Sequence, residues 1–297
     1  MIMKKEYFFV IITGILSGFI VFGGQIFLNL GLSLFQISFI TQLLIVLILL
    51  PFIILNKNLR PKNGMNWLWV LYGFATAIIV FAQYGAVVLG LSVAIVVLLL
   101  YTQPLWTIII SRLFFKEKLT KTKIISCAIV LLGMIILVNP FDAEIKSSAG
   151  IILALVGGLA LSLWVIIGSV VSKRKVPPIT IKFINATLTT MFFLMFYPIL
   201  LFFTKEPSII RFSFDISLTI WIGLIIFTLF AEIINHLSYY KGVKKVPATD
   251  AGIILLLEPV TGALLATAFL NQALTLNIIA GGILILIANY LIIKNSN

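Results

Sequence analysis

Long apolar runs alternate with short polar segments along the whole chain. A helix needs about 17 to 25 apolar residues to cross the hydrocarbon core of a bilayer, and ten of the runs approach or meet that length. The pattern therefore predicts an all-α polytopic membrane protein with ten transmembrane helices. The predicted spans are residues 7–28, 33–55, 67–89, 93–115, 124–138, 149–171, 179–203, 218–240, 248–270 and 276–293.

The composition excludes a water-soluble protein. Hydrophobic residues make up 62% of the chain and charged residues 10%, with a mean hydropathy of +1.22. The first span follows Lys4 and Lys5, is too long for a secretory signal and has no small-residue cleavage site after it, so it is assigned as the first helix. The single cysteine, Cys127, lies inside a span, which rules out an intramolecular disulfide and favours a packing role.

The distribution of basic residues predicts the orientation. With ten helices, all of the 21 Lys and Arg residues except Lys146, Lys205 and Arg211 fall on one side of the membrane. Because short cytoplasmic loops retain basic residues, both termini are predicted to be cytoplasmic. The same topology, together with attraction to anionic lipids, accounts for the net charge of +12. No face combines basic and aromatic residues, so a nucleic-acid partner is not expected.

One motif occurs twice in the chain, at residues 101–120 and 256–275. The two copies share Pro104 with Pro259, Phe114 with Phe269, Leu119 with Leu274 and Thr120 with Thr275, and they place Gln103 opposite Glu258. Three basic residues of the first copy, Arg112, Lys116 and Lys118, are replaced by Thr267, Asn271 and Ala273 in the second. This loss of charge is expected if the loops that follow the two copies lie on opposite sides of the membrane.

The repeat and the topology together predict two inverted halves. Ten helices divide into two sets of five, residues 1–142 and 147–297, and an odd number of helices forces the second set to enter the membrane from the opposite side. Inverted repeats of this kind are typical of secondary transporters, whose substrate sites lie near the midplane between the repeats.

The repeated motif and the two five-helix halves resemble those of a known family. Each half ends in a helix of the form xPxxxx(I/L)xxxxFxxxxLT and a glycine-bearing last helix, which resembles EamA-type transporters of the drug/metabolite transporter superfamily. The second copy departs from the family pattern in having Asn271-Gln272 instead of Gly-Glu, a change that bears on the helix end rather than on transport. The resemblance implies alternating access, a small and often exported organic substrate, and a central cavity lined by the first, third, fourth, sixth, eighth and ninth helices.

The two prolines mark the candidate substrate site. A proline inside a helix displaces the carbonyl four residues earlier, here that of Leu100 or Leu255, and the freed group needs a neighbouring helix or a cavity. Either kink could also serve packing alone. Glu258 lies next to Pro259, and a carboxylate at this depth must be protonated, paired or facing water. We expect it to contact substrate or a coupling proton; the alternative is a protonated Glu258 bonded to the freed carbonyl.

The eighth span carries the remaining charges inside the membrane. Glu232 and His236 are four residues apart and so lie on one helix face, and an imidazole titrates near neutral pH. Glu232, His236 and Glu258 are therefore candidates for proton coupling. In the competing interpretations, His236 extends to the membrane interface, and Glu232 pairs with Lys241 or with a polar group of a neighbouring helix.

Further polar and aromatic residues at similar depth complete the predicted cavity. Asn235 could orient the Glu232–His236 pair or join two helices. The full set of predicted cavity residues is Gln25, Gln83, Tyr84, Tyr101, Gln103, Pro104, Trp164, Glu232, Asn235, His236, Tyr239, Glu258 and Pro259.

The glycines have a different predicted role. Gly14 with Gly18, Gly157 with Gly158, and Gly281 with Gly282 are assigned to close helix packing. Spans 124–138 and 276–293 carry few polar groups and are expected at the periphery, where they could mediate dimer contacts.

These features predict a secondary transporter that exports a small organic metabolite, such as an amino acid, across the cell membrane. A broad exporter of drugs or organic cations is the alternative within this class, because acids in an aromatic setting suit cations. An enzyme is disfavoured by the lack of a nucleophile–base or metal-ligand set, and a channel by the lack of a filter loop. No metal or cofactor is expected. The expected partners are the substrate and the lipid bilayer, and the chain is expected to be a monomer or a homodimer.

Overall fold

The computed structural model describes residues 4–61, 66–140, 147–174 and 176–295, and within these ranges it contains helices and no strand. Ten helical spans are long and apolar enough to cross a membrane, which confirms the predicted number. They are α1 (Lys5–Asn29), α2 (Leu34–Leu55), α3 (Trp67–Val88), α4 with α5 (Val93–Leu100, Gln103–Phe115), α6 (Lys121–Val138), α7 (Ser148–Lys173), α8 (Pro178–Phe203), α10 with η3 and α11 (Leu218–Phe227, Thr228–Ile234, Asn235–Gly242), α12 with α13 (Ala248–Ile254, Leu257–Phe269) and α14 (Leu276–Lys294).

Short helices η1 (Lys57–Leu59) and α9 (Pro207–Ile210) lie in connections between spans. The predicted boundary between the halves, near residue 142, falls outside the described residues. Ten long apolar helices make the chain a multi-pass membrane protein.

Side-chain caps fix where many of the spans begin. Ser33, Ser92, Thr120, Ser147, Ser217 and Thr275 each accept a hydrogen bond from the backbone N–H three residues later. Thr120 and Thr275 are the last residues of the repeated motif, so the shared Leu-Thr sequence is the start signal for α6 and α14. The cap at Thr120 also explains why α6 begins about three residues before the hydropathy pattern predicts.

The repeat is visible in the backbone as well. Lys116 follows α5 with a φ of 51°, and its counterpart in the motif, Asn271, has a φ of 55°. Both residues therefore end the same turn in the left-handed region, which asparagine tolerates better than most residues. The departure from glycine at Asn271 thus preserves the helix end.

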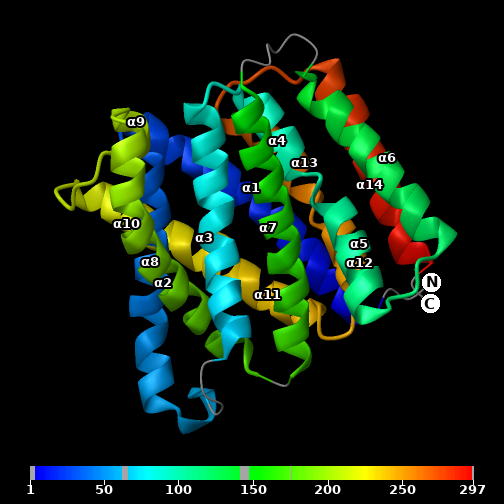
Figure 1. The fold of residues 1–297 in the computed structure, drawn as a ribbon, viewed down its shortest axis with the longest axis horizontal. Helices are drawn as coiled ribbons and strands as arrows, with labels where there is room; N and C mark the ends of the chain where they lie inside the picture. Colours follow the sequence, from blue (N-terminus) through cyan, green and yellow to red (C-terminus); the bar gives the residue numbers. More distant parts are fainter. Residues whose placement is uncertain (1–3, 62–65, 141–146, 175, 296–297) are drawn as a thin grey trace.

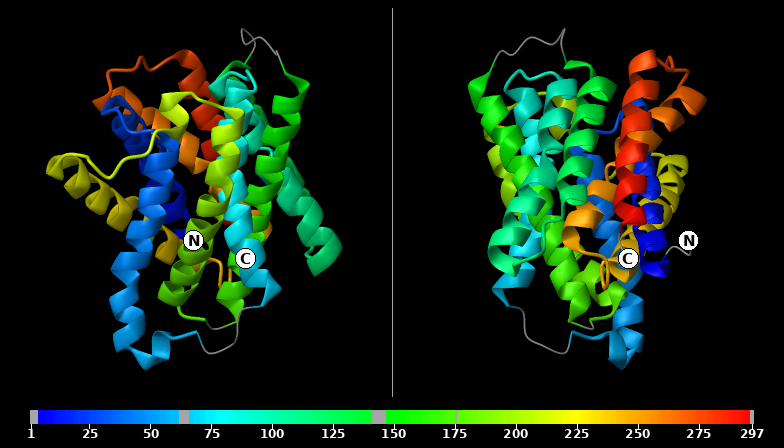
Figure 2. Two further views of the ribbon diagram at one scale, coloured as in Figure 1. Left: turned by 60° about the vertical axis from the view of Figure 1, so that its left-hand side comes forward. Right: turned by 90° about the vertical axis from the view of Figure 1, so that its right-hand side faces the viewer.

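Each half packs its first helix against the broken helix of the other half. Helix α1 lies along α12 and α13, and α7 lies along α4 and α5 (Figures 1 and 2). Glycines bring these backbones close, because a Cβ on Gly14 would lie 2.9 Å from the carbonyl oxygen of Ile254, and one on Gly158 would lie 2.8 Å from that of Leu99. The packing role predicted for these glycines is confirmed, and the arrangement interlocks the two halves.

Helices α6 and α14 pair at one edge of the bundle, as Figure 1 shows. Their backbones meet where a Cβ on Gly281 would lie 2.5 Å from the carbonyl oxygen of Gly133. Cys127 is buried in α6 and forms no disulfide. The peripheral position predicted for these two spans is thus confirmed.

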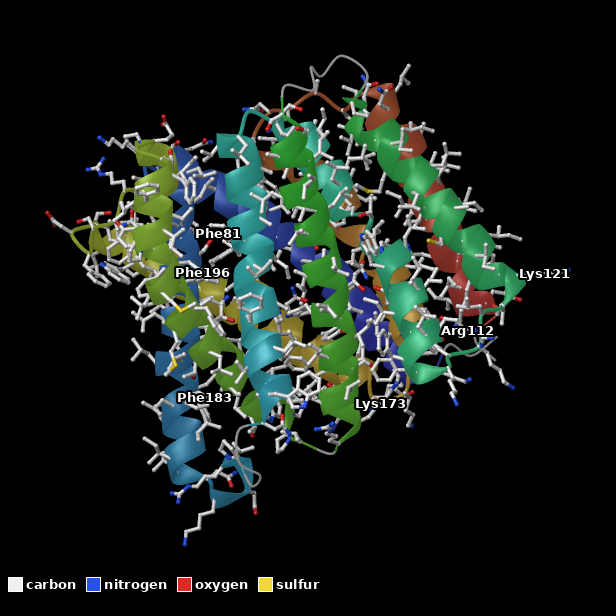
Figure 3. The ribbon with its side chains drawn as sticks, in the orientation of Figure 1. Phe81, Arg112, Lys121, Lys173, Phe183 and Phe196 are labelled. Carbon is white, nitrogen blue, oxygen red and sulfur yellow. The ribbon has the colours of Figure 1, made fainter. Side chains whose placement is uncertain are left out.

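Both termini lie close together at the same side of the bundle, which is also the side of the α2–α3 connection (Figures 1 and 2). We call this the terminus side and the opposite one the far side. Arg112, Lys121 and Lys173 lie toward the terminus side, near the ends of α5, α6 and α7 (Figure 3).

Substituting one glycine of α1 tests the interlocked packing. In Gly18→Ala, the added Cβ would meet the Thr261 Cβ at 2.5 Å and the Gly262 backbone nitrogen at 2.7 Å, so we expect a loss of about 1 to 3 kcal/mol in the free energy of unfolding. The matched control is Gly24→Ala on the same helix, where no atom lies within 4 Å. Thermal unfolding in detergent should show a lower midpoint for the first variant only; equal midpoints would contradict this packing.

Candidate functional site

Two broken helices meet at the centre of the site. Helix α4 ends at Leu100 and α5 begins at Gln103, while α12 ends at Ile254 and α13 begins at Leu257. The interruptions lie just before Pro104 and Pro259, so the kinks predicted from the prolines are confirmed. Thr102 donates a hydrogen bond to the carbonyl of Leu99 at 2.7 Å, which satisfies part of the backbone exposed by the first break.

Tyr101 and Glu258 connect the two breaks. Tyr101 follows the last residue of α4, Glu258 lies in the first turn of α13, and their side chains are close enough to interact electrostatically. Both side chains are half-buried. A carboxyl group contributed by one half therefore lies near a phenol contributed by the other, at the point where both helices are interrupted.

Gln103 is placed differently from its counterpart Glu258. It is buried, with an exposed fraction of 1%, and its amide donates to Thr107. Thr107 in turn donates to Ser162 of α7 at 3.0 Å. The two repeat-related positions are thus asymmetric, because Gln103 is engaged in packing between α5 and α7 while the Glu258 side chain remains partly accessible.

Glu232 forms a buried ion pair with a residue of a neighbouring helix, which was one of the alternatives considered from the sequence, although Lys182 was not identified as that partner. Its Oε2 lies 3.0 Å from Nζ of Lys182 on α8, whose side chain is only 1% exposed. The side chain of Gln42 on α2 lies beside this carboxylate. Lys241, the ion-pair partner considered from the sequence, instead lies 5.6 Å from the ring centroid of Phe9. Lys182 was counted with the interfacial basic residues because it comes close to the start of a span.

His236 lies against the same carboxylate. Its Nδ1 is 3.6 Å from Oε2 of Glu232 and 2.6 Å from the Glu232 carbonyl oxygen. Because a carbonyl can only accept, Nδ1 carries the proton in this contact. Glu232 belongs to η3, a seven-residue π-helical segment, and His236 to α11 directly after it. Wide turns of this type are frequent at functional sites.

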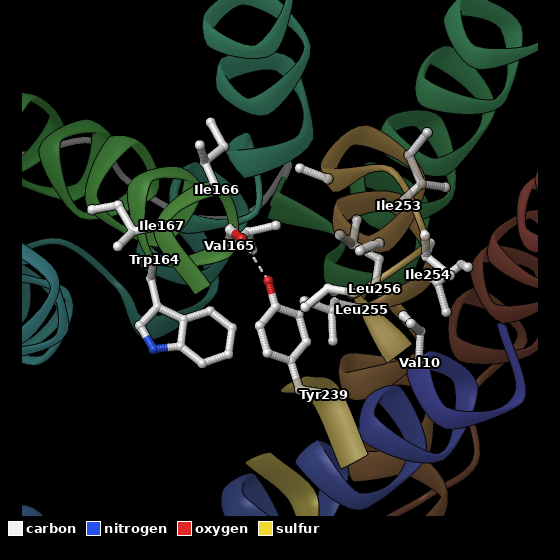
Figure 4. Packing of buried hydrophobic residues seen from close by; sticks show 14 of the residues in the cluster. Val10, Trp164, Val165, Ile166, Ile167, Tyr239, Ile253, Ile254, Leu255 and Leu256 are labelled. Carbon is white, nitrogen blue, oxygen red and sulfur yellow. Dashed lines mark hydrogen bonds between the residues drawn. The ribbon is translucent and has the colours of Figure 1, made fainter. Parts of the chain in front are cut away.

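An aromatic cluster packs against His236. The Trp164 ring stacks on Tyr239 at 4.7 Å between centroids and meets His236 edge-on at 5.4 Å. Figure 4 shows Trp164 beside Tyr239, whose hydroxyl donates to the Val165 carbonyl at 2.6 Å. Glu232 and Glu258 are close enough for their charges to interact.

The other predicted cavity residues are dispersed. Asn235 is buried and donates to Ser17 of α1 at 3.0 Å, which joins two helices. Gln25 is exposed and donates to Asn29, and Gln83 is half-buried on α3. The side chain of Tyr84 lies outside the described part of the chain. Across the described ranges, no group of three or more His, Cys, Asp or Glu residues is arranged to hold a metal ion.

A second polar network ties the two halves together on the terminus side. Lys123 of α6 lies 2.8 Å from Oε1 of Glu117 and 3.0 Å from Oδ1 of Asp250 at the start of α12. Tyr7 of α1 donates to Oδ2 of Asp250 at 2.6 Å, and Thr249 donates to Glu117. We call these five residues the latch. The latch contacts that join the two halves connect residues 126 to 243 positions apart in the sequence. No local sequence signal therefore predicts their pairing.

The fold and the site define a class: a helical membrane carrier built from two repeats whose broken helices meet at a polar centre. The EamA-like transporter family model matches residues 4–139 and 148–294, so the chain belongs to this family. A transporter, rather than an enzyme, is therefore the class of protein.

Relatives and solved structures agree with this assignment. The chain is 26% identical over 310 residues to an "Uncharacterized transporter" of Clostridium kluyveri, covering 99% of this chain and 96% of the relative. It is 29% identical over 245 residues to one of Archaeoglobus fulgidus, covering 82% of each. A crystal structure with 16% sequence identity superimposes with a TM-score of 0.72 over 95% of each chain, which shows the shared fold.

Removal of Lys182 tests the buried ion pair. Lys182→Met leaves Glu232 as an unpaired buried charge, so the free energy of unfolding should fall by about 3 to 5 kcal/mol. Lys182→Met combined with Glu232→Gln should recover most of this loss, whereas Lys241→Met serves as the control. Unfolding by denaturant in mixed micelles measures all three variants. A double variant as unstable as Lys182→Met would contradict the pairing.

Loss of the central lysine should loosen the latch. In Lys123→Met, Glu117 and Asp250 lose their shared partner, so amide hydrogen exchange in α12 should accelerate by about tenfold or more. Lys121→Met, an exposed lysine of the same helix, is the matched control. Mass spectrometry of exchanged peptides gives the rates; equal rates in α12 for both variants would exclude the latch as a stabilising contact between the halves.

Proposed function

We propose that this protein is a secondary transporter that moves a small organic metabolite, an amino acid or a similar solute, across the cell membrane by alternating access. The observation that carries the proposal is the Tyr101–Glu258 pair, which places a partly accessible carboxyl group at the junction of two broken helices. Interrupted helices facing each other across an inverted repeat are the usual site of substrate binding in secondary carriers. Export is the direction that the family resemblance implies.

The latch supports alternating access. It joins α1 and α6 to the start of α12 on the terminus side. Alternating access requires contacts that close one side while the other is open, and partly buried ion pairs between halves can form and separate in this way. In this proposal the latch closes the terminus side, which the basic-residue pattern assigns to the cytoplasm.

The chemistry of the centre suits a substrate with an amino group. A carboxylate can bind an ammonium group, and the half-buried Tyr101 ring near Glu258 can provide cation–π and apolar contacts. The same combination would suit larger organic cations, so a broad drug or organic-cation exporter is the second candidate. The two differ in the range of amines that compete for transport.

Glu232, His236 and Glu258 are the proposed proton-coupling residues. Glu258 is the strongest candidate of the three because Tyr101 is a neutral partner, whereas Glu232 is neutralised by Lys182. A carboxyl group with a neutral partner can gain or lose a proton without breaking an ion pair. Glu232 and His236 would then adjust the field around Glu258.

Counterflow in proteoliposomes tests the proposed carrier function. Vesicles loaded with one solute at high concentration are assayed for uptake of trace radiolabelled amino acids, amines and nucleosides. A carrier gives saturable counterflow without chemical change in the solute. Conversion of the solute would indicate an enzyme, and flux that never saturates would indicate a channel; either result would overturn the proposal.

Glu258→Gln should distinguish substrate exchange from transport that is coupled to protons. The substitution keeps the shape of the side chain and removes its proton, so uptake driven by a pH gradient should fall by about tenfold or more while counterflow is retained. The control is Glu206→Gln in the exposed α9 connection. The same assays on Glu232→Gln and His236→Gln complete the test: if all three variants keep gradient-driven transport, the coupling proposal is wrong.

A further inference from the structure

A cavity of about 300 Å³ lies on the terminus side, away from the broken helices. It is formed by the connection from α2 to α3 in the first half and by the connection from α7 to α8 in the second. The polar side chains around it belong to Asn58, Arg60, Asn66, Arg174 and Thr180. Trp69 and Ile184, both buried, supply its apolar floor.

The described side chains that line the cavity carry only positive charge. Among the described residues that line it, Arg60 and Arg174 are the charged ones and none is acidic. One nitrogen of Arg60 donates to the Ile54 carbonyl at 2.7 Å, which orients the guanidinium and leaves its other N–H groups available. Neither arginine forms an ion pair in the described part of the chain.

The acidic residues nearest this side of the membrane are committed elsewhere. Glu6 pairs with Lys245 at 2.6 Å, and Glu117 and Asp250 share Lys123 in the latch. Positive charge at the cavity is therefore not compensated by a carboxylate of the described chain, and an external anion can compensate it instead.

Two helices also begin at this cavity. Helix α3 begins after Asn66, whose side chain accepts no hydrogen bond from the first turn, and α8 begins with Pro178, so its first available N–H is that of Ile179. The first N–H groups of a helix have no partner within the helix and carry its positive dipole end. Both helices exceed 20 residues, and their starts add two further sources of positive potential to the two arginines.

We propose that this cavity binds a phosphate group, with the Arg60 and Arg174 guanidinium groups as charged donors and the starts of α3 and α8 as supporting dipoles. Planar guanidinium groups match the geometry of phosphate oxygens, and two of them can neutralise a phosphate monoanion or dianion. The apolar floor beside a polar rim at the end of the spans suits the headgroup of an anionic phospholipid; free phosphate has the same chemistry without the acyl chains. A ligand bound here would join one connection of each half.

The test compares two double variants of the full chain purified in detergent. Arg60→Gln with Arg174→Gln removes the charges that line the cavity. Lys57→Gln with Lys173→Gln removes two exposed charges from the same connections but outside the cavity, so net charge is matched. Because Arg60 also holds the Ile54 carbonyl, Arg174→Gln alone is included as the variant least expected to disturb folding.

Three probes distinguish the sources of the phosphate: inorganic phosphate, phosphatidylglycerol, and phosphatidylcholine as the zwitterionic control. Native mass spectrometry gives lipid binding, and the shift of the unfolding midpoint gives phosphate binding. We expect the arginine variants, including Arg174→Gln alone, to lose about tenfold or more in affinity for phosphatidylglycerol, phosphate or both, while the lysine variant retains it.

The pattern of binding identifies the source. A response to phosphatidylglycerol alone supports a lipid site, and a response to phosphate supports a soluble anion. Two results would overturn the proposal: equal affinities for both anionic probes in the arginine and lysine variants, or equal binding of phosphatidylcholine and phosphatidylglycerol by the wild-type chain with no response to phosphate.

Discussion

Every acidic group inside this bundle needs a partner contributed by the protein, because hydrocarbon provides none, and this requirement organises the structure around its polar centre. Glu232 is paired with Lys182, and Glu258 lies near Tyr101. Each contact connects helices that are distant in the sequence. The two acids at the centre of the bundle therefore also provide contacts between helices.

The two acids of the centre differ in a way that separates their roles. Glu232 has a charged, buried partner, so changing its protonation would leave Lys182 uncompensated. Glu258 has a neutral partner and a half-buried side chain, so its protonation can change at lower cost. The first is suited to a structural role beside the π-helical segment, and the second to contact with solute or proton. Under the proposed function, the asymmetry between Gln103 and Glu258 would confine contact with solute or proton to one half.

Much of the architecture could be predicted from the sequence, for physical reasons that are local. Hydropathy marks the spans, Thr120 and Thr275 cap the helices that follow them, and Pro104 and Pro259 break the helices in which they lie. Each of these signals acts within a few residues of the chain.

Partners across helices could not be predicted in the same way. Lys182 and Glu232 are 50 residues apart, and Glu117 and Thr249 are 132 apart, so their contacts depend on the rotation of each helix about its axis. In helices that are apolar on nearly all sides, the sequence pattern defines that rotation poorly. The same limit explains why Gln103, predicted to line the cavity, is instead buried against Thr107.

Accessibility of position 258 tests the central claim of alternating access most directly. The variant Glu258→Cys in a Cys127→Ser background carries one thiol, at the junction of the broken helices. If the protein alternates between open states, a membrane-impermeant thiol reagent should modify this cysteine when added from either side, in separate preparations of sealed vesicles. Modification from one side only, or from neither, would contradict the account.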